Sequence, residues 1–102
     1  MARTPEGKVK EKIKKFLKLN DIYFTMPFTA GYGASGVPDI LVCYKGRFIG
    51  IECKAQGNTP TTLQAEHMRR IRLGGGMAVV VDENNVDAMM IQLFNRDDDG
   101  RC

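Results

Sequence analysis

The sequence predicts an α/β fold in which helices flank a small sheet. Three observations predict it: two segments with helical periodicity and helix-start signals, 4–19 and 59–73, a β-hairpin pattern over 37–54, and a continuous apolar run over 77–81. Apolar periods of about 3.6 and about 2 residues distinguish helices from strands. Helical and strand patterns that alternate along the chain favour one sheet covered by helices.

The first helix is predicted over residues 4–19, because Thr4-Pro5 is a typical helix start and Asn20-Asp21 ends the pattern. The segment 22–28 is rich in β-branched and aromatic residues, so we expect a first strand there. Residues 29–36 are rich in glycine and are expected to form a mobile loop. The apolar stripe of the helix consists of Val9, Ile13, Phe16 and Leu17.

The register of the predicted hairpin depends on the turn at Lys45-Gly46. A two-residue primed turn requires positive φ, which glycine adopts freely. Tyr44 then pairs with Arg47, and Asp39 falls directly opposite Glu52. A three-residue turn would instead shift the register by one residue and place the two carboxylates on opposite faces.

These carboxylates form a candidate catalytic site with Lys54. Because side chains alternate along a strand, Asp39, Glu52 and Lys54 share one face. Like charges that face each other destabilise a sheet, so we expect a hard divalent cation between them. Carboxylate oxygens suit Mg²⁺ or Mn²⁺, which share their remaining positions with water and phosphate oxygens. Such a metal can polarise a phosphodiester while Lys54 orients or deprotonates the attacking water, which predicts a hydrolytic site for nucleic acid.

The second half of the chain is predicted to contain a helix, a strand and a final helix. Thr59-Pro60 opens the helix, and Gly74-Gly75-Gly76 closes it. The apolar run 77–81 is typical of a strand buried on both faces. Residues 85–94 form a short helix whose apolar surplus indicates core packing or, alternatively, a dimer interface. We expect residues 95–102 to fray.

Composition predicts a single domain that works in the cytosol of its host. The 102 residues are 43% hydrophobic, which supports one modest core, and no apolar run approaches the ~20 residues that span a bilayer. No signal-peptide pattern is present, and three cysteines, an odd number, imply neither a disulfide nor zinc. Because His67 is the single histidine, oxygen ligands must carry any catalysis.

The distribution of charge favours a nucleic-acid partner. The net charge is +3, but acidic residues gather late in the chain and lysines crowd the first helix. A basic face near the site suits DNA phosphates, although a solvated amphipathic helix looks the same in sequence. The lysines expected to contact DNA are Lys8, Lys12 and Lys15.

The run from Gly31 to Gly36 satisfies the G-x-G-x-x-G dinucleotide pattern. That pattern should open a helix whose N-terminus binds pyrophosphate. Pro38-Asp39 and a β-prone segment follow instead, so no nucleotide cofactor is expected. We predict a DNA-facing loop in which Tyr32 and Ser35 contact the nucleic acid.

Pro38-Asp39 followed by Glu52-x-Lys54 matches the PD-(D/E)xK nuclease motif. With Gly36–Val42 and Thr61–Gln64, this motif resembles the VRR-NUC (virus-type replication-repair nuclease) family in its compact stand-alone form, over roughly residues 4–82. The resemblance implies a restriction-endonuclease-like αβββαβ core with a mixed central sheet, and Mg²⁺- or Mn²⁺-dependent cleavage of structured DNA. Stand-alone phage and bacterial members are associated with cleavage of four-way (Holliday) junctions as dimers. We therefore expect a homodimer that acts on branched DNA.

The resemblance also implies roles for individual residues. Asp39 and Glu52 would be metal ligands, the backbone carbonyl of Cys53 would complete the coordination, and Lys54 would be the catalytic lysine. An aliphatic residue is usual at Cys53, but its side chain should point to the opposite face. Gln64 would support the site, although it could instead be the fourth residue of a helix capping box.

A further acidic ligand is implied on the first helix, where Glu6 and Glu11 compete. Glu6 continues the apolar stripe and would face the sheet, whereas Glu11 lies on the far side between Lys8 and Lys15. We therefore choose Glu6 as the metal ligand. The simpler reading is a first-turn acid that complements the helix dipole.

Two alternatives differ in function but not in fold. One is a DNA-binding module that has kept the fold without turnover, against which the complete set of Asp39, Glu52 and Lys54 argues. The other is a nuclease for flaps, nicked ends or linear duplex DNA. No recognisable sequence-reading element is present, so weak base specificity is expected.

Overall fold

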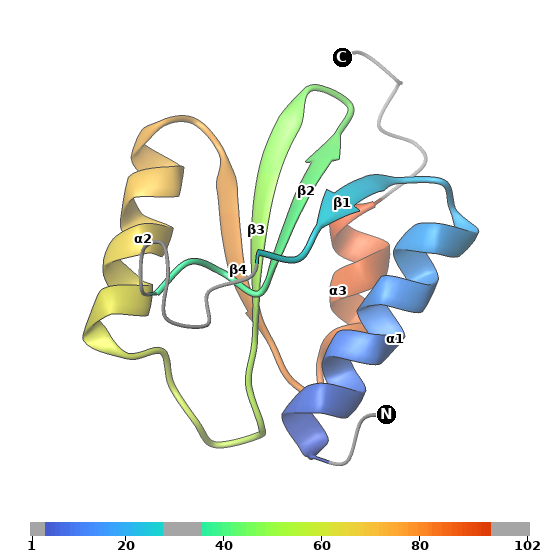
Figure 1. Ribbon diagram of the computed structural model, residues 1–102, viewed down its shortest axis with the longest axis horizontal. Helices are drawn as coiled ribbons and strands as arrows, with labels where there is room; N and C mark the ends of the chain where they lie inside the picture. The colour runs from blue at the N-terminus through green and yellow to red at the C-terminus, as the bar shows by residue number, and fades with distance from the viewer. Residues whose placement is uncertain (1–3, 28–35, 95–102) are drawn as a thin grey trace.

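A computed structural model describes residues 4–27 and 36–94 and places helices on both faces of a four-stranded sheet (Figure 1). Helices α1 and α3 cover one face, and α2 covers the other. The predicted α/β class is confirmed. Within the described ranges, none of the helices has the length and apolar character needed to cross a membrane. The elements are α1 (Pro5–Leu19), β1 (Tyr23–Thr25), β2 (Ile40–Tyr44), β3 (Arg47–Cys53), α2 (Thr62–Leu73), β4 (Met77–Val81) and α3 (Val86–Leu93).

The sheet is mixed, with the strand order β1-β2-β3-β4. The pairs β1–β2 and β2–β3 are antiparallel, and β3–β4 is parallel. A parallel pair needs a long crossover connection, and α2 supplies it between β3 and β4. The described chain therefore contains the expected αβββαβ core, followed by the additional helix α3.

The turn between β2 and β3 fixes the register that the sequence predicts. Lys45 and Gly46 both have positive φ, 50° and 79°, as a two-residue type I′ turn requires. Tyr44 pairs with Arg47, and Ile40 pairs with Ile51. The predicted hairpin register is confirmed.

Strand β1 is shorter than predicted, whereas β2 covers the predicted residues 40–44. β1 covers only Tyr23–Thr25, because Pro27 has no N–H for a longer ladder. β2 begins at Ile40, so Asp39 lies one residue before the strand. The ladder ends there because the next donor, Cys53 N–H, bonds to the Asp39 side chain at 2.8 Å.

The principal core lies between the sheet and the pair α1–α3. The buried stripe of α1 consists of Val9, Ile13 and Leu17, as its spacing predicts, and Phe16 packs at the edge of this core. Full burial of each such side chain contributes about 2 kcal/mol relative to exposure. The opposing core residues from the sheet and α3 are Ile40, Val42, Ile49, Ile51, Cys53, Val81, Val86, Met90, Leu93 and Phe94.

Helix α2 begins two residues later than the predicted start at Thr59-Pro60. The N-cap is Thr61, whose hydroxyl accepts from Gln64 N–H at 3.2 Å, while Gln64 Oε1 accepts from Thr61 N–H at 2.9 Å. This reciprocal capping box satisfies two backbone donors, which a start at Pro60 could not do. The prediction of Pro60 as the helix start was wrong.

Strand β4 has the predicted bounds but is less buried than expected. Ala78 and Val81 are buried, whereas Met77, Val79 and Val80 are half-buried, because β4 is an edge strand. Arg72 Nη2 donates to the Ala78 carbonyl at 2.7 Å. Covering an edge carbonyl in this way discourages pairing with another chain.

Gly36, three residues before Asp39, lies against the backbone of helix α2. Its φ is +91°, and an added Cβ would lie 2.8 Å from the backbone carbon of Leu63. We expect Gly36→Ala to lower the free energy of unfolding by about 3 kcal/mol, from left-handed strain and steric overlap. Urea unfolding measures this loss.

Gly57→Ala is the matched control for this substitution. Gly57 also has positive φ, +89°, but nothing lies within 4 Å of its added Cβ. Strain alone should cost about 1 kcal/mol there. Equal losses at the two positions would contradict a close approach at Gly36.

Candidate active site

The start of β2 and the end of β3 lie side by side and bring the predicted catalytic residues together. Asp39 immediately precedes β2, Glu52 is the penultimate residue of β3, and Lys54 follows that strand directly. The register Ile40–Ile51, continued by one residue, sets Asp39 opposite Glu52. The spatial arrangement predicted for these three residues is therefore present.

The two oxygens of Asp39 have different partners. Oδ2 accepts from the backbone N–H of Cys53 at 2.8 Å, which fixes the carboxylate against β3. Oδ1 lies 3.7 Å from Nζ of Lys10, a residue of α1. The side chains of Asp39 and Lys10 are 22% and 33% exposed, so solvent and ligands can reach them.

Glu52 is the buried charged residue of the described chain, with 2% of its surface exposed. Oε2 lies 3.5 Å from Lys54 Nζ, and Oε1 is buried without a hydrogen-bond partner among the described residues. Burial, and then the negative charge of Asp39, raise the pKa of Glu52 to about 7, and Lys54 partly opposes them. An orphaned carboxylate oxygen in the interior costs free energy and needs a physical explanation.

The Cys53 thiol belongs to the core on the opposite face. Its side chain is fully buried, as the predicted alternation requires. Burial, and then Asp39, raise the pKa of this thiol to about 12, so it stays protonated and is neither nucleophile nor thiolate ligand. The backbone N–H of Cys53 donates to Asp39 Oδ2, and the role of its carbonyl as a metal ligand stays a prediction.

The two acidic candidates on α1 occupy different surfaces. Glu6 is half-buried in the first turn, and its charge contributes to raising the pKa of Glu52, after burial and Asp39. Glu11 is exposed and lines a depression on the outer surface of α1. The charge of Glu6 thus acts on Glu52, and its role as a ligand stays a prediction.

Gln64 is held by the capping box of α2. It is half-buried, and its Oε1 accepts from the N–H of Thr61. This is the structural alternative that the sequence offers for Gln64. Support of the active site by the remaining amide group stays a prediction.

The lysines predicted to bind DNA are all exposed. Lys12 pairs with Asp87 of α3 at 2.9 Å, which joins the two helices. A shallow depression of about 780 Å³ on α1 is lined by Glu11, Lys12, Lys14, Lys15, Lys18 and Leu19. Lys8 lies outside it and is also exposed. Tyr32 and Ser35 lie outside the described residues.

A residue that the sequence reasoning missed is Lys10. It was not among the predicted DNA contacts, yet it forms the ion pair with Asp39. Its spacing of four residues from Glu6 was the available signal, because residues i and i+4 lie on the same side of a helix.

The oxygen donors at this site fit Mg²⁺ or Mn²⁺ better than a softer metal. Over residues 4–27 and 36–94, no three Asp, Glu, His or Cys side chains form a ready-made metal cage. Mg²⁺ commonly takes only one or two carboxylates and completes its shell with water and substrate phosphates. The unpartnered Oε1 of Glu52 is a ligand atom of the required kind.

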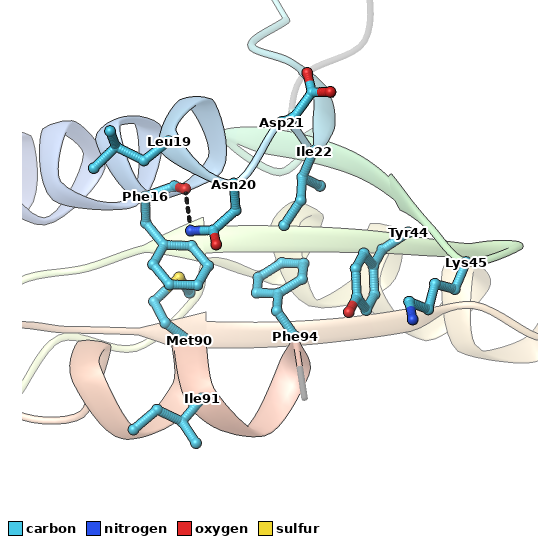
Figure 2. Close-up of a pocket in the computed structure, with 10 residues that line it drawn as sticks. All are labelled: Phe16, Leu19, Asn20, Asp21, Ile22, Tyr44, Lys45, Met90, Ile91 and Phe94. Carbon is cyan, nitrogen blue, oxygen red and sulfur yellow. Dashed lines mark hydrogen bonds between the residues drawn. The ribbon is translucent and has the colours of Figure 1, made fainter. Parts of the chain in front are cut away.

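A second hollow, at the opposite end of β2, has a different character. This pocket of about 660 Å³ lies between α1, α3 and the hairpin turn, and its residues are drawn in Figure 2. The Phe94 ring packs 5.7 Å from Phe16 and 5.1 Å from Tyr44, measured between ring centroids. Figure 2 shows Asp21 turned away from these rings, and the lining combines aromatic side chains with the polar residues Asn20 and Lys45.

The mixed sheet, its flanking helices and the acidic end of its central hairpin define an α/β fold with a candidate catalytic site at one end of the sheet. No family model matches the sequence. Among solved structures, the chain is similar to a "VRR_NUC domain protein", with a TM-score of 0.72 and 20% identity over 94% of this chain and 92% of that one. The resemblance to VRR-NUC proteins is confirmed, and the chain has the VRR-NUC fold.

One curated relative comes from a phage. The chain is 36% identical over 59 residues to "Putative nuclease p44" of Acyrthosiphon pisum secondary endosymbiont phage 1. The match covers 57% of this chain and 63% of that protein. The chain thus spans less than two thirds of the relative's length.

Proposed function

We propose that this protein is a divalent-metal-dependent endonuclease that hydrolyses phosphodiester bonds in branched DNA. The observation that carries the proposal is the buried, partly unpaired carboxylate of Glu52 beside Asp39 and Lys54. A purely structural glutamate would be expected to have partners for both oxygens. The similarity to a phage protein described as a nuclease supports the same conclusion.

Two carboxylate oxygens, Oδ1 of Asp39 and Oε1 of Glu52, would hold the cation together with the backbone carbonyl of Cys53. Glu6 of α1 would join them as a ligand only after its side chain moved closer, because no three acidic side chains of the described chain already form a metal site. When bound, a divalent cation supplies positive charge to the phosphodiester oxygens and makes water more acidic. The hydrogen bond from Cys53 N–H keeps Asp39 aimed at this position.

Lys54 is positioned to act on the attacking water. Its side chain is only 13% exposed, and the Glu52 carboxylate 3.5 Å away restrains the ammonium. A restrained ammonium can orient water toward phosphorus and stabilise the negative charge that develops on the phosphate in the transition state. Gln64, in this proposal, contributes through its amide group.

The lysine-rich surface of α1 supplies the electrostatic part of DNA binding. Lys8, Lys12 and Lys15 are exposed on the surface of α1, the helix that also contains Glu6. Contacts of this kind release counterions, so binding should weaken steeply as salt rises. They carry no base specificity.

Branched DNA and a homodimer are the finer parts of the proposal. One small site cuts one strand, so symmetrical cleavage of a four-way junction needs two sites. A two-fold dimer places two identical sites in the relation that a symmetrical junction requires. Light scattering that finds only monomer, both free and on DNA, would remove the junction-resolving version.

The proposal is tested by cleavage of labelled four-way junction, flap and linear duplex side by side, with Mg²⁺, Mn²⁺ or chelator. Paired symmetrical cuts in the junction that disappear with chelator are expected. Cuts confined to flaps or duplex would keep the nuclease and change its substrate. Binding to all three DNAs without cleavage would instead favour a DNA-binding module that shares the fold.

A further inference from the structure

Lys10 occupies the one oxygen of Asp39 that the backbone leaves open. Oδ2 is taken by Cys53 N–H at 2.8 Å, and Oδ1 faces Lys10 Nζ at 3.7 Å. The separation is longer than a hydrogen bond, so the ammonium is held mainly by charge. A cation that bound Oδ1 of Asp39 would therefore compete with Lys10.

The two lysines at this site differ in how firmly they are held. Lys54 is 13% exposed and paired with the buried Glu52, whereas the Lys10 side chain is 33% exposed on the surface of α1. A lysine ammonium on its flexible four-carbon stem can reorient at little cost when its head remains solvated. Lys10 is therefore the group that can move when a second positive charge arrives.

We propose that Lys10 is a displaceable counter-ion of Asp39. It pairs with Oδ1 when no divalent cation is bound, and it turns to a DNA phosphate when a cation takes that oxygen. The inference rests on the proposed metal-dependent nuclease, but it adds a positioning residue that couples the cation to the DNA.

The coupling has a definite sign. With Asp39 free of metal, Lys10 is neutralised by the carboxylate and contributes little to binding a phosphate. A cation on Asp39 repels Lys10 and frees its charge for the DNA. By linkage, the cation then strengthens DNA binding, and the DNA strengthens cation binding by the same factor.

The first measurement is Mn²⁺ affinity without DNA, by calorimetric titration of the wild type, Lys10→Met and Arg69→Met. Arg69→Met is the matched control, because it removes one positive charge and one carboxylate ion pair, with Glu66 at 2.7 Å, on the exposed surface of α2. Lys10→Met should bind Mn²⁺ about threefold to tenfold more tightly than wild type, since the competing ammonium is gone. Arg69→Met should match the wild type.

The second measurement is affinity for a four-way junction, with Ca²⁺ or with chelator, in the same three proteins. Gel analysis confirms that the DNA stays intact. Ca²⁺ should strengthen binding by the wild type and by Arg69→Met, and should strengthen it several-fold less for Lys10→Met. This difference distinguishes the coupling from an ordinary phosphate contact. If Lys10 made only such a contact, its loss would weaken DNA binding equally with Ca²⁺ and with chelator.

The outcomes separate this inference from the nuclease proposal. Mn²⁺ affinity of Lys10→Met that is unchanged or weaker, in a wild type that binds Mn²⁺ and cleaves DNA, overturns the counter-ion role alone. An equal loss of DNA affinity with and without Ca²⁺ overturns it as well. A wild type that neither binds Mn²⁺ nor cleaves DNA overturns both proposals.

Discussion

Replacing Lys54 with methionine is expected to slow DNA cleavage by about a thousand-fold under single-turnover conditions. Methionine keeps the length and apolar character of the lysine stem. It therefore fills the space of the Lys54 side chain, which is only 13% exposed. The ammonium that orients water and stabilises developing charge is lost. Cleavage of the labelled junction at saturating protein and Mg²⁺ measures the effect.

Folding should survive this change because Glu52 can take up a proton. The pKa of Glu52 is raised to about 7, by burial first and by Asp39 second, and removal of Lys54 removes a cause that lowers it. Glu52 can therefore become neutral rather than remain as a lone buried charge. Circular dichroism should give a native spectrum for the variant.

Arg69→Met serves as the control for loss of one cationic side chain. Its ion pair with Glu66 lies on an exposed helix surface, where such pairs contribute little to stability. Cleavage by Arg69→Met should stay within about twofold of wild type. A Lys54→Met protein that is folded and cleaves as fast as the control would remove Lys54 from the mechanism.

Local sequence signals were sufficient for most of the fold. The Lys45-Gly46 pair predicted the type I′ turn, and the turn fixed the pairing of Tyr44 with Arg47. Turn chemistry acts over a few residues, so it can be read without tertiary information. The apolar period of α1 likewise predicted which side of the helix meets the sheet.

The start of α2 shows where two local signals conflict. Pro60 suits the first turn of a helix that Thr59 would cap, but Thr61 and Gln64 form a reciprocal capping box that starts the helix two residues later. Two hydrogen bonds outweigh the fixed φ of proline. The sequence contained both signals, and the relative free energies of the two possible helix starts decided between them.

The contacts of Asp39 depend on tertiary structure. Its carboxylate takes the Cys53 N–H that would otherwise continue the strand ladder, so the pairing of β2 with β3 ends at Ile40. Whether Lys10 reaches Oδ1 depends on how α1 packs across the sheet. Neither contact follows from the spacing of residues along the chain.

The stability of the protein in chelator is expected to fall as the pH rises from about 5 to about 8. The pKa of Glu52 is raised from 4.5 to about 7 in the folded state, chiefly by burial and then by Asp39. Between those values the folded state binds more protons than the unfolded state, so its advantage is full below about 4.5 and is lost through about 7. The shift corresponds to about 3 kcal/mol.

Other shifted groups leave this pH window clear. The pKa of the Cys53 thiol, raised by burial and then by Asp39, is about 12, so it stays protonated throughout. The pKa of Glu66 is lowered by its hydrogen bond with Arg69, so its contribution is lost only on acidification below its ordinary range. Among residues 4–27 and 36–94, Glu52 is therefore the shifted group that titrates between pH 5 and 8.

Glu52→Gln tests the assignment, because glutamine keeps the shape of the side chain and cannot ionise. In chelator at pH 8 the variant should be more stable than wild type by up to about 3 kcal/mol, and at pH 5 the two should be similar. Urea midpoints at each pH, with an unchanged m-value, measure this difference. Mg²⁺ at pH 8 should recover stability in the wild type only, because it pairs with the charge that burial disfavours. If the stability of Glu52→Gln in chelator still fell between pH 5 and pH 8, another group would be responsible for the pH dependence. That result would also argue against Glu52 as the buried charge that a cation neutralises.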